Sequence, residues 1–326
     1  MIAVLIDQHN IKGVAYHRLY VPFRNLQKKG YNVKFFENLS DLTQAELKQC
    51  KAIMASRGFI PKYGHKVLQQ ELHRQGIQIV IDQDDWWSLD NWHPMIEVFN
   101  KTNKRKNIHD SIIYSDWVTV THKKLAKKVT KLDKNTRAVI IPNAIDAGDK
   151  QWKYKRQESD KVRFGYIAGA SHVRDVEELG GYNFKAEGKE LVVADVQDYK
   201  TQLGATTVLE PLDAFNYATL YDGVDVSIAP LKSTEFNKMK SELKILEAGF
   251  KKCAFIGSNI HPYTNLIKSG VNGILCSNER EWREAIEGMT KEKAKEMGDR
   301  LYKDVQQFEI NNVNRIREKF FFDNKK

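Results

Sequence analysis

The sequence predicts an α/β protein made of two doubly wound domains, each with a parallel sheet between layers of helices. Short apolar runs alternate with helix-like segments along both halves of the chain, which is typical of βαβ units. The apolar runs are almost continuous, as in parallel strands that are buried on both faces. The chain has 326 residues, enough for two domains of roughly 150 residues each.

The first half contains six apolar runs that predict strands, separated by segments with helical periodicity. We expect these elements to form an N-terminal domain over residues 1–146. The predicted strands lie at 2–7, 32–37, 52–56, 77–82, 117–121 and 138–143. The predicted helices lie at 14–29, 43–50, 63–75, 94–115 and 122–132.

The second half repeats this scheme and predicts a C-terminal domain over residues 162–306. A polar segment at 147–161, poor in branched apolar residues, predicts the linker between the domains. Within 307–326, a further helix is expected at 308–322. The predicted strands lie at 162–168, 190–196, 206–212, 224–231, 253–257 and 273–276. The predicted helices lie at about 213–222, 241–250, 262–268, 278–288 and 291–306.

The positive charge is concentrated in the first half. The whole chain carries a net charge of +10. Residues 1–150 hold 24 Lys and Arg against 15 Asp and Glu, whereas residues 151–326 hold 28 against 27. This asymmetry predicts an anionic partner for the first half.

The cysteines and the apolar runs of the sequence indicate the cellular compartment of the protein. Cys50, Cys253 and Cys276 show no paired spacing, so we expect reduced, buried thiols. The run at the N-terminus is too short for a signal peptide and ends on an aspartate. No apolar stretch approaches the ~18 residues that span a bilayer. These features predict a cytoplasmic protein without a transmembrane segment.

The segment KSELKILEAGF (240–250) carries chemistry suited to a nucleotide. With Ser241 as N-cap, the helix would offer free N–H groups and a positive dipole end to phosphate, and Lys240 and Lys244 would add charge. Glu247 lies six residues after Ser241, about 9 Å along a helix, where a carboxylate suits two ribose hydroxyls. The alternative is a solvated helix with one Glu–Lys pair.

This segment and the residues just before it resemble the nucleotide-sugar site of GT-B glycosyltransferases similar to family four. The resemblance rests on the order of Asn237, Lys240, Ser241, Lys244 and Glu247. The stretches 258–286 and 141–146 are similar to further segments of that family. The resemblance implies two Rossmann-like domains facing a cleft and a C-terminal helix crossing back to the first domain. It also implies a UDP- or GDP-linked sugar as substrate, with no cofactor and no metal.

The resemblance places Lys240 and Ser241 on the donor diphosphate, Glu247 on the ribose, and Lys244 in contact with donor or acceptor. One position departs from the common signature of two glutamates. Met239 stands where the first, sugar-contacting glutamate is expected. The form present here resembles a subset of the family that includes bacteriophage members.

The loop DQDDWW (82–87) follows the fourth predicted strand. Asp84 and Asp85 are candidate catalytic bases for an acceptor hydroxyl. Trp86 offers a flat apolar face on which a sugar ring or base can stack. The alternative is an acidic loop that caps the next helix, with its tryptophans in the core.

A glycine follows the first strand of each domain, and the family resemblance places both glycine loops near the donor diphosphate. In the first loop, Gly13 permits close approach of a ligand. His17 and Arg18 then lie within reach of an anionic group. The second loop contains Gly169, His172 and Arg174, with Arg174 expected on the diphosphate and His172 on sugar or phosphate. Ordinary strand-to-helix turns are the alternative for both loops.

Residues 101–137 hold eleven Lys and Arg against three Asp and Glu. A lysine cluster lies on the predicted helix 122–132, with Leu125 and Val129 on the opposite side. A solvated face, an anionic membrane surface and nucleic acid are the alternatives, and the lack of large exposed apolar residues favours nucleic acid. The cluster consists of Lys123, Lys124, Lys127, Lys128 and Lys131.

The sequence thus predicts a nucleotide-sugar-dependent hexosyl- or pentosyltransferase. The expected acceptor is a hydroxyl, with a hydroxylated base in DNA as the favoured anionic case, because phage-like relatives include such enzymes. A glycan or lipid acceptor, a non-catalytic module that binds nucleic acid or polysaccharide, and a sugar-nucleotide epimerase are the alternatives.

Overall fold

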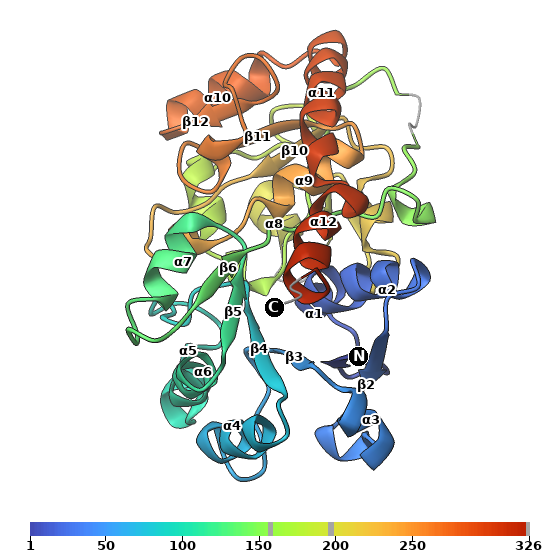
Figure 1. Cartoon of the computed structure of the whole chain (residues 1–326). Helices are drawn as coiled ribbons and strands as arrows, with labels where there is room; N and C mark the ends of the chain where they lie inside the picture. The colour runs from blue at the N-terminus through green and yellow to red at the C-terminus, as the bar shows by residue number, and fades with distance from the viewer. Residues whose placement is uncertain (156–158, 195–198, 324–326) are drawn as a thin grey trace. The chain divides into compact units, whose positions relative to one another are not determined.

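The computed structural model describes residues 1–155, 159–194 and 199–323, and the chain divides into two compact units. The N-terminal unit comprises residues 1–89, 95–144 and 310–326, and the C-terminal unit comprises residues 90–94 and 145–309. Each unit is described by itself. Figure 1 labels their elements.

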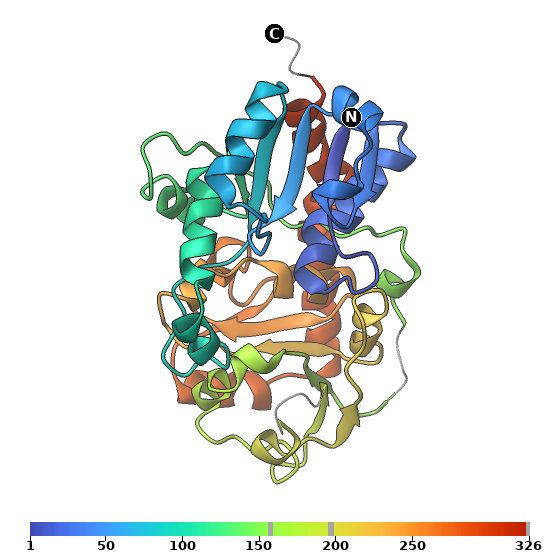
Figure 2. The same ribbon diagram turned by 90° about the horizontal axis from the view of Figure 1, so that it is seen from below.

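The N-terminal unit contains a six-stranded parallel sheet in the order β2-β1-β3-β4-β5-β6 (Figure 2). Ala3 and Leu5 pack in one core, whereas Ile2 and Val4 pack in another, so β1 is buried on both faces as predicted. All six predicted strands are confirmed. They are β1 (Ile2–Leu5), β2 (Val33–Phe36), β3 (Ala52–Ser56), β4 (Gln78–Gln83), β5 (Trp117–Val120) and β6 (Ala138–Ile140).

The helices of this unit follow the predicted alternation with local differences. Thr43 caps α3 by accepting from the amide of Glu46, and His122 caps α7 through Nδ1. The single helix expected over 94–115 is two helices. The helices are α1 (Gly13–Ala15), a π-helical turn (Tyr16–Tyr20), α2 (Val21–Lys28), α3 (Gln44–Gln49), α4 (His65–Arg74), α5 (Ile96–Lys101), α6 (Lys104–Ile113) and α7 (Lys123–Val129).

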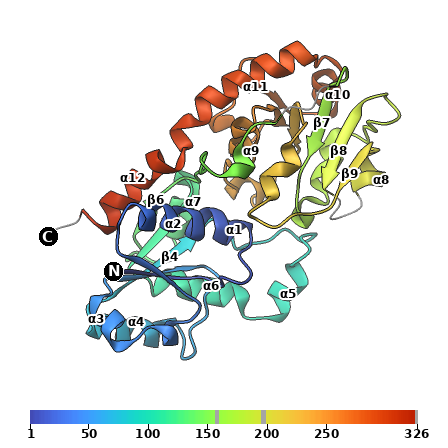
Figure 3. The same ribbon diagram turned by 90° about the vertical axis from the view of Figure 1, so that its right-hand side faces the viewer.

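The helix α12 (Ile310–Phe321) belongs to the N-terminal unit although it follows the C-terminal unit in the chain. It packs against α2, as Figure 3 also shows. The fully buried Asn314 donates through Nδ2 to the carbonyl of Pro22 at 2.9 Å. The ring centroids of Phe23 and Phe321 are 5.4 Å apart. The predicted return of the last helix to the first domain is confirmed.

The C-terminal unit contains a second six-stranded parallel sheet in the order β12-β11-β10-β7-β8-β9. Figure 3 shows β7, β8 and β9 side by side. The predicted strands are again confirmed, except that residues 195 and 196 lie outside the described residues. The strands are β7 (Arg163–Tyr166), β8 (Glu190–Ala194), β9 (Thr207–Leu209), β10 (Val226–Ala229), β11 (Ala254–Ser258) and β12 (Ile274–Cys276).

The helices of the C-terminal unit differ from prediction mainly by being short. The segments expected as helices at 213–222 and 262–268 form 3-10 turns at Tyr217–Tyr221 and Tyr263–Asn265. α8 was not predicted. The α-helices are α8 (Tyr199–Leu203), α9 (Leu243–Phe250), α10 (Glu279–Glu287) and α11 (Lys291–Val305).

The predicted linker at 147–161 lies within the C-terminal unit instead. Gln151 and Trp152 are buried, and Trp152 packs in the core with Tyr221 and Phe250. Residues 156–158 of this segment lie outside the described residues. The hydrophobic effect favours burial of Trp152 in this core, and that burial attaches the polar segment to the C-terminal unit.

Candidate active site

Two loops of the C-terminal unit carry most of the predicted donor-site residues. One loop follows β7 and contains Gly169, His172 and Arg174, and the other follows β10 and contains Lys240. The strands β7 and β10 are hydrogen-bonded neighbours in a parallel sheet, so both loops leave the same edge. Ligands bind at this edge in open α/β sheets.

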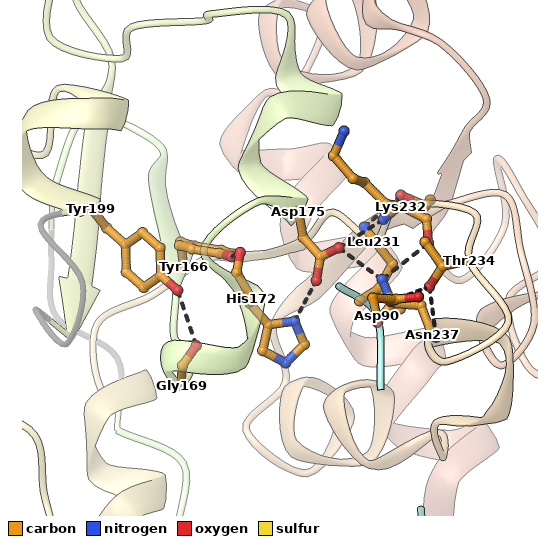
Figure 4. Close-up of polar contacts among 11 residues, drawn as sticks. Asp90, Tyr166, Gly169, His172, Asp175, Tyr199, Leu231, Lys232, Thr234 and Asn237 are labelled. Carbon is orange, nitrogen blue, oxygen red and sulfur yellow. Dashed lines mark hydrogen bonds and ion pairs between the residues drawn. The ribbon is translucent and has the colours of Figure 1, made fainter. Parts of the chain in front are cut away.

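Asp175 joins the two loops (Figure 4). The whole residue is 1 % exposed, and its Oδ2 lies 2.8 Å from Nδ1 of His172. Oδ1 accepts from the backbone N–H of Lys232 at 2.9 Å and from Nδ2 of Asn237 at 2.8 Å. Asn237 also donates to the Lys232 carbonyl at 3.0 Å, and its own N–H donates to Oγ1 of Thr234. The carboxylate thereby fixes His172 relative to the second loop.

His172 is held in its neutral form. Burial and the nearby ammonium of Lys240 lower the pKa of His172 to about 4, against the opposing effect of Asp175. The neutral ring carries one N–H, and the adjacent carboxylate accepts it at Nδ1. Nε2 is then the ring's hydrogen-bond acceptor, suited to a hydroxyl group.

Two buried tyrosines fix the backbone of the first loop. The hydroxyl of Tyr199 donates to the carbonyl of Gly169 at 3.0 Å, and that of Tyr166 donates to the carbonyl of His172 at 3.4 Å. A Cβ at Gly169 would meet no atom within 4 Å, so the loop is open to a ligand there. Arg174 is exposed and directly precedes the 3-10 turn Asp175–Leu179.

The start of α9 differs from the prediction. The helix begins at Leu243 with Glu242 as N-cap, so Ser241 lies one residue before the cap. Glu247 is therefore five residues, or about 7.5 Å, after the capping residue, rather than six residues, or about 9 Å, after a capping Ser241. Lys240 is in an extended conformation, and its Nζ lies 4.8 Å from the ring centroid of Phe236. Met239 is buried.

Glu247 lies in a buried polar cluster at the middle of α9. Its Oε2 accepts from Nζ of Lys244 at 2.8 Å and from the hydroxyl of Tyr221 at 2.8 Å. Lys244 also donates to the hydroxyl of Tyr217. Burial opposes the charge on Lys244, but Glu247 and Tyr217 outweigh it and raise its pKa. The two tyrosines were missed from the sequence, although their i, i+4 spacing would place them on one face of the α-helix predicted over 213–222. In the structure they lie in the 3-10 turn Tyr217–Tyr221, with ring centroids 6.3 Å apart.

In the N-terminal unit, Arg57 lies beside both predicted catalytic carboxylates. Its Nε is 3.5 Å from Oδ1 of Asp84, and its Nη2 is 3.9 Å from Oδ2 of Asp85. Burial raises the pKa of Asp84, partly offset by the charge of Arg57. A carboxylate with a raised pKa is a better proton acceptor at neutral pH. Sequence reasoning missed Arg57, which follows the neighbouring strand β3.

Trp86 follows these carboxylates and packs against Trp87, with ring centroids 4.3 Å apart and ring planes tilted by 34°. The ammonium of Lys128 lies 5.0 Å from the centroid of the Trp86 ring. Lys128 is half-buried, whereas the other four lysines of the predicted cluster on and after α7 are exposed. Leu125 and Val129 are fully buried, as predicted.

The position of Arg18 contradicts the prediction that its side chain can reach an anionic ligand. It is 2 % exposed, and its guanidinium donates to both oxygens of Asp82 and to the carbonyl of Ile141 at 2.7 Å. These buried contacts give it a structural role instead of contact with an anionic ligand. His17 is also buried in the π-helical turn, whereas Gly13 is exposed at the first position of the three-residue α1.

The comparisons with known proteins bear on the fold. No family model and no curated protein matches the chain. Sucrose-phosphate synthase of Thermosynechococcus elongatus matches with a TM-score of 0.65 at 12 % identity, over 98 % of each chain. HepE of Anabaena, solved with UDP and glucose, matches with a TM-score of 0.63 at 13 % identity, also over 98 % of each chain. The chain has the GT-B fold.

The same fold is present in larger proteins. TarM of S. aureus matches over 83 % of this chain with a TM-score of 0.58 at 10 % identity, and this chain spans 55 % of its length. Within the GT-B fold found here, the C-terminal unit holds His172 near Lys240 and Lys244, with Lys244 bonded to Glu247, and the N-terminal unit holds the consecutive Asp84, Asp85 and Trp86.

Two further observations concern the residues that the structure describes. None of their helices combines the length and the apolar character needed to cross a bilayer. Nor do their His, Cys, Asp and Glu side chains form a group of three or more arranged to hold a metal ion.

Proposed function

We propose that the chain transfers a sugar from a nucleoside-diphosphate sugar to an acceptor hydroxyl. The main support is the cluster of cationic and hydrogen-bonding groups on the loops after β7 and β10. These loops leave the edge of the sheet where we expect GT-B proteins such as HepE to bind UDP. The pneumococcal transferase GtfA was likewise solved with UDP and GlcNAc, which favours a UDP-linked hexose as the donor over a GDP-linked sugar or a pentose.

In this proposal, different residues contact the diphosphate and the ribose of the donor. Lys240 and the exposed Arg174 offer charge to the diphosphate, with the open backbone at Gly169 and Ser241 beside it. Glu247 offers its carboxylate to the ribose, held in place by Tyr221 and Lys244.

In the transfer step, the acceptor oxygen forms a bond to the anomeric carbon of the sugar. The bond from that carbon to the diphosphate oxygen breaks, and the nucleoside diphosphate leaves with the electron pair. Asp84 or Asp85 takes the acceptor's proton. Lysine and arginine charges stabilise the negative charge that grows on the leaving diphosphate, so we propose that neither a metal nor another cofactor takes part. Activity is then expected to persist in excess EDTA.

A panel of UDP, GDP and ADP tests the donor site by thermal shift, followed by hydrolysis of the matching nucleotide-sugars without acceptor. We expect UDP to stabilise the protein. Lys240→Ala should weaken UDP binding by about tenfold or more, as the loss of a charge-assisted contact predicts. Lys293→Ala, on the exposed face of α11, is the control. A protein that binds no nucleotide and hydrolyses no nucleotide-sugar would instead be a non-catalytic module.

The lysines on and after α7 favour an anionic acceptor, for which DNA carrying a hydroxylated base is the candidate. Transfer assays on DNA with and without hydroxymethylated bases test it. Replacing Lys123, Lys127 and Lys131 by glutamate should weaken DNA binding and flatten its dependence on salt, because each lost phosphate contact lowers the slope by about 0.9. Equal binding by the triple variant would contradict a nucleic-acid acceptor.

A further inference from the structure

A short segment from the first half of the sequence belongs to the C-terminal unit. Residues 90–94 (DNWHP), here called the strap, pack in this unit, although the chain on both sides of them lies in the N-terminal unit. The carbonyl of Asp90 accepts the backbone N–H of His93 at 2.9 Å, which closes the strap into a turn. The strap begins five residues after Asp85, one of the two proposed bases. Contacts of the strap therefore also constrain the loop that carries these bases.

The first contact of the strap is a hydrogen bond to the loop after β10 (Figure 4). The hydroxyl of Thr234 donates to Oδ2 of Asp90 at 2.8 Å. A hydroxyl can donate and accept at once, and the same oxygen accepts the backbone N–H of Asn237 at 3.1 Å. Asn237 donates through Nδ2 to Oδ1 of Asp175, whose Oδ2 lies beside His172. A continuous series of hydrogen bonds thus joins Asp90 to the histidine of the proposed donor site.

The second contact of the strap is aromatic. The ring centroids of His93 and Phe236 are 5.1 Å apart and the ring planes are 74° apart, so the rings meet edge to face. Phe236 is buried, and the ammonium of Lys240 lies 4.8 Å from the centroid of its ring. A cation at this distance is attracted to the ring. Phe236 is therefore shared between the strap and the lysine that offers charge to the diphosphate.

A buried tryptophan anchors the chain just before the strap. Trp87 is buried in a core of the N-terminal unit. It lies three residues before Asp90, and three residues span about 11 Å at most when fully extended. The strap therefore has little slack on this side. A movement of the loop after β10 is then expected to move the segment between Asp84 and Asp90.

We propose that Asp90 and His93 are positioning residues of the transferase, and that the strap couples nucleotide binding to the loop that carries Asp84 and Asp85. A nucleotide at Lys240 and the docked strap act on the same loop, so each stabilises the other, and such coupling is reciprocal. The proposal rests on the proposed function, since it takes the loop after β10 as part of the donor site. The alternative is a strap that only adds to the stability of the fold.

Hydrogen exchange of the full chain, measured by mass spectrometry with and without saturating UDP, tests the coupling. We expect UDP to slow exchange in peptides from the strap of the wild type by at least about fivefold, the lower end of typical coupling between two sites. Asp90→Ala should abolish this slowing, and His93→Ala should reduce it. Because the coupling is reciprocal, Asp90→Ala should also weaken UDP binding by the same factor, measured by calorimetry. Asp299→Ala should keep the slowing and is the matched control, since Asp299 is a half-buried aspartate of the same unit that pairs with Lys295 on α11.

Kinetics of transfer, or of donor hydrolysis without acceptor, separate positioning from a general loss of structure. Asp90→Ala and Thr234→Val should each lower kcat by about tenfold, equivalent to one hydrogen bond to a charged group. The double variant should be no slower than the slower single variant, because both changes break the same contact. Asp90→Asn should keep kcat within about threefold of the wild type, since its amide oxygen can still accept from the Thr234 hydroxyl.

The outcomes also separate the role of the strap from the transferase activity. If UDP binds to the wild type but leaves exchange of the strap unchanged, only the role of the strap is overturned. It is also overturned if Asp90→Asn is as slow as Asp90→Ala, because the lost hydrogen bond would then not be the cause. If no nucleotide binds, the loop after β10 is not a donor site and both proposals fail. Slowing that Asp90→Ala abolishes and Asp299→Ala retains supports the coupling.

Discussion

Oδ2 of Asp175 lies 2.8 Å from Nδ1 of His172, while Oδ1 of the same carboxylate accepts two N–H groups from the loop after β10. One carboxylate therefore sets both the orientation of His172 and the separation of the two loops. This arrangement leads to two predictions, one on activity and one on stability.

Asp175→Asn is expected to lower kcat for transfer by about 10- to 100-fold, by analogy with the carboxylates that orient metal-ligating histidines. The amide oxygen of the variant can satisfy Lys232 and Asn237, which leaves its NH₂ group facing Nδ1 of His172. The ring must then accept at Nδ1 and carry its proton on Nε2. Nitrogen NMR of labelled histidine reports the tautomer directly. An unchanged tautomer with reduced kcat would contradict this explanation.

The lowered pKa of His172 makes stability depend on pH. The folded group titrates at about 4 and the unfolded group at 6.5, so the unfolded chain binds the extra proton between these values. The contribution is fully present above pH 6.5 and is lost as the pH falls to 4, at a cost of about 3 kcal/mol. Urea unfolding of the wild type and His172→Gln at pH 7 and pH 4.5 measures it. The variant should lose less stability over this interval, and equal losses would contradict the prediction.

Arg57 should control the acidic limb of the pH–rate profile if Asp84 is the base. Burial raises the pKa of Asp84, and the charge of Arg57 lowers it. Arg57→Met removes only the second effect, so the limb should move to higher pH. Lys34→Met is the control, because Lys34 pairs with Glu46 instead. A limb that stays in place would assign the proton transfer to a group other than Asp84.

The Lys244–Glu247 pair predicts strong coupling between two substitutions. Glu247→Ala leaves the ammonium of Lys244 largely buried without its carboxylate and should cost about 3 kcal/mol of unfolding free energy. Adding Lys244→Met should recover part of this loss, because it removes the unpaired charge. Denaturant unfolding of the two single variants and the double variant gives the coupling energy. Additive losses would show that the pair is not coupled.

Asn314 should anchor α12 to the N-terminal unit. Its Nδ2 donates to the Pro22 carbonyl and to Oδ1 of Asn25, and its Oδ1 accepts from Arg317 at 3.1 Å. Asn314→Ala should cost about 2 kcal/mol, because buried polar partners lose their hydrogen bonds. Arg315→Ala, at the next residue and exposed, should change stability by less than about 0.5 kcal/mol. Similar losses in both variants would contradict an anchoring role for the buried hydrogen bonds of Asn314.

The central strands were predictable because each is a short, almost wholly apolar run, and burial on both faces requires that composition. Side-chain partners were not predictable when they come from distant strands. Arg18 and Asp82 are 64 residues apart, and only the fold shows that they meet and remove Arg18 from the site. The start of α9 was missed because serine and glutamate at 241 and 242 are both plausible before a helix, and spacing alone does not decide between them.

The position of α12 has a consequence for how the protein is made. The helix closes one face of the N-terminal unit, yet it emerges from the ribosome only after residues 145–309 have been translated. While the second-made unit is synthesised, the first-made unit therefore lacks the contact between Phe23 on α2 and Phe321. Nascent chains that stall before residue 310 should attract chaperones that bind exposed apolar helices.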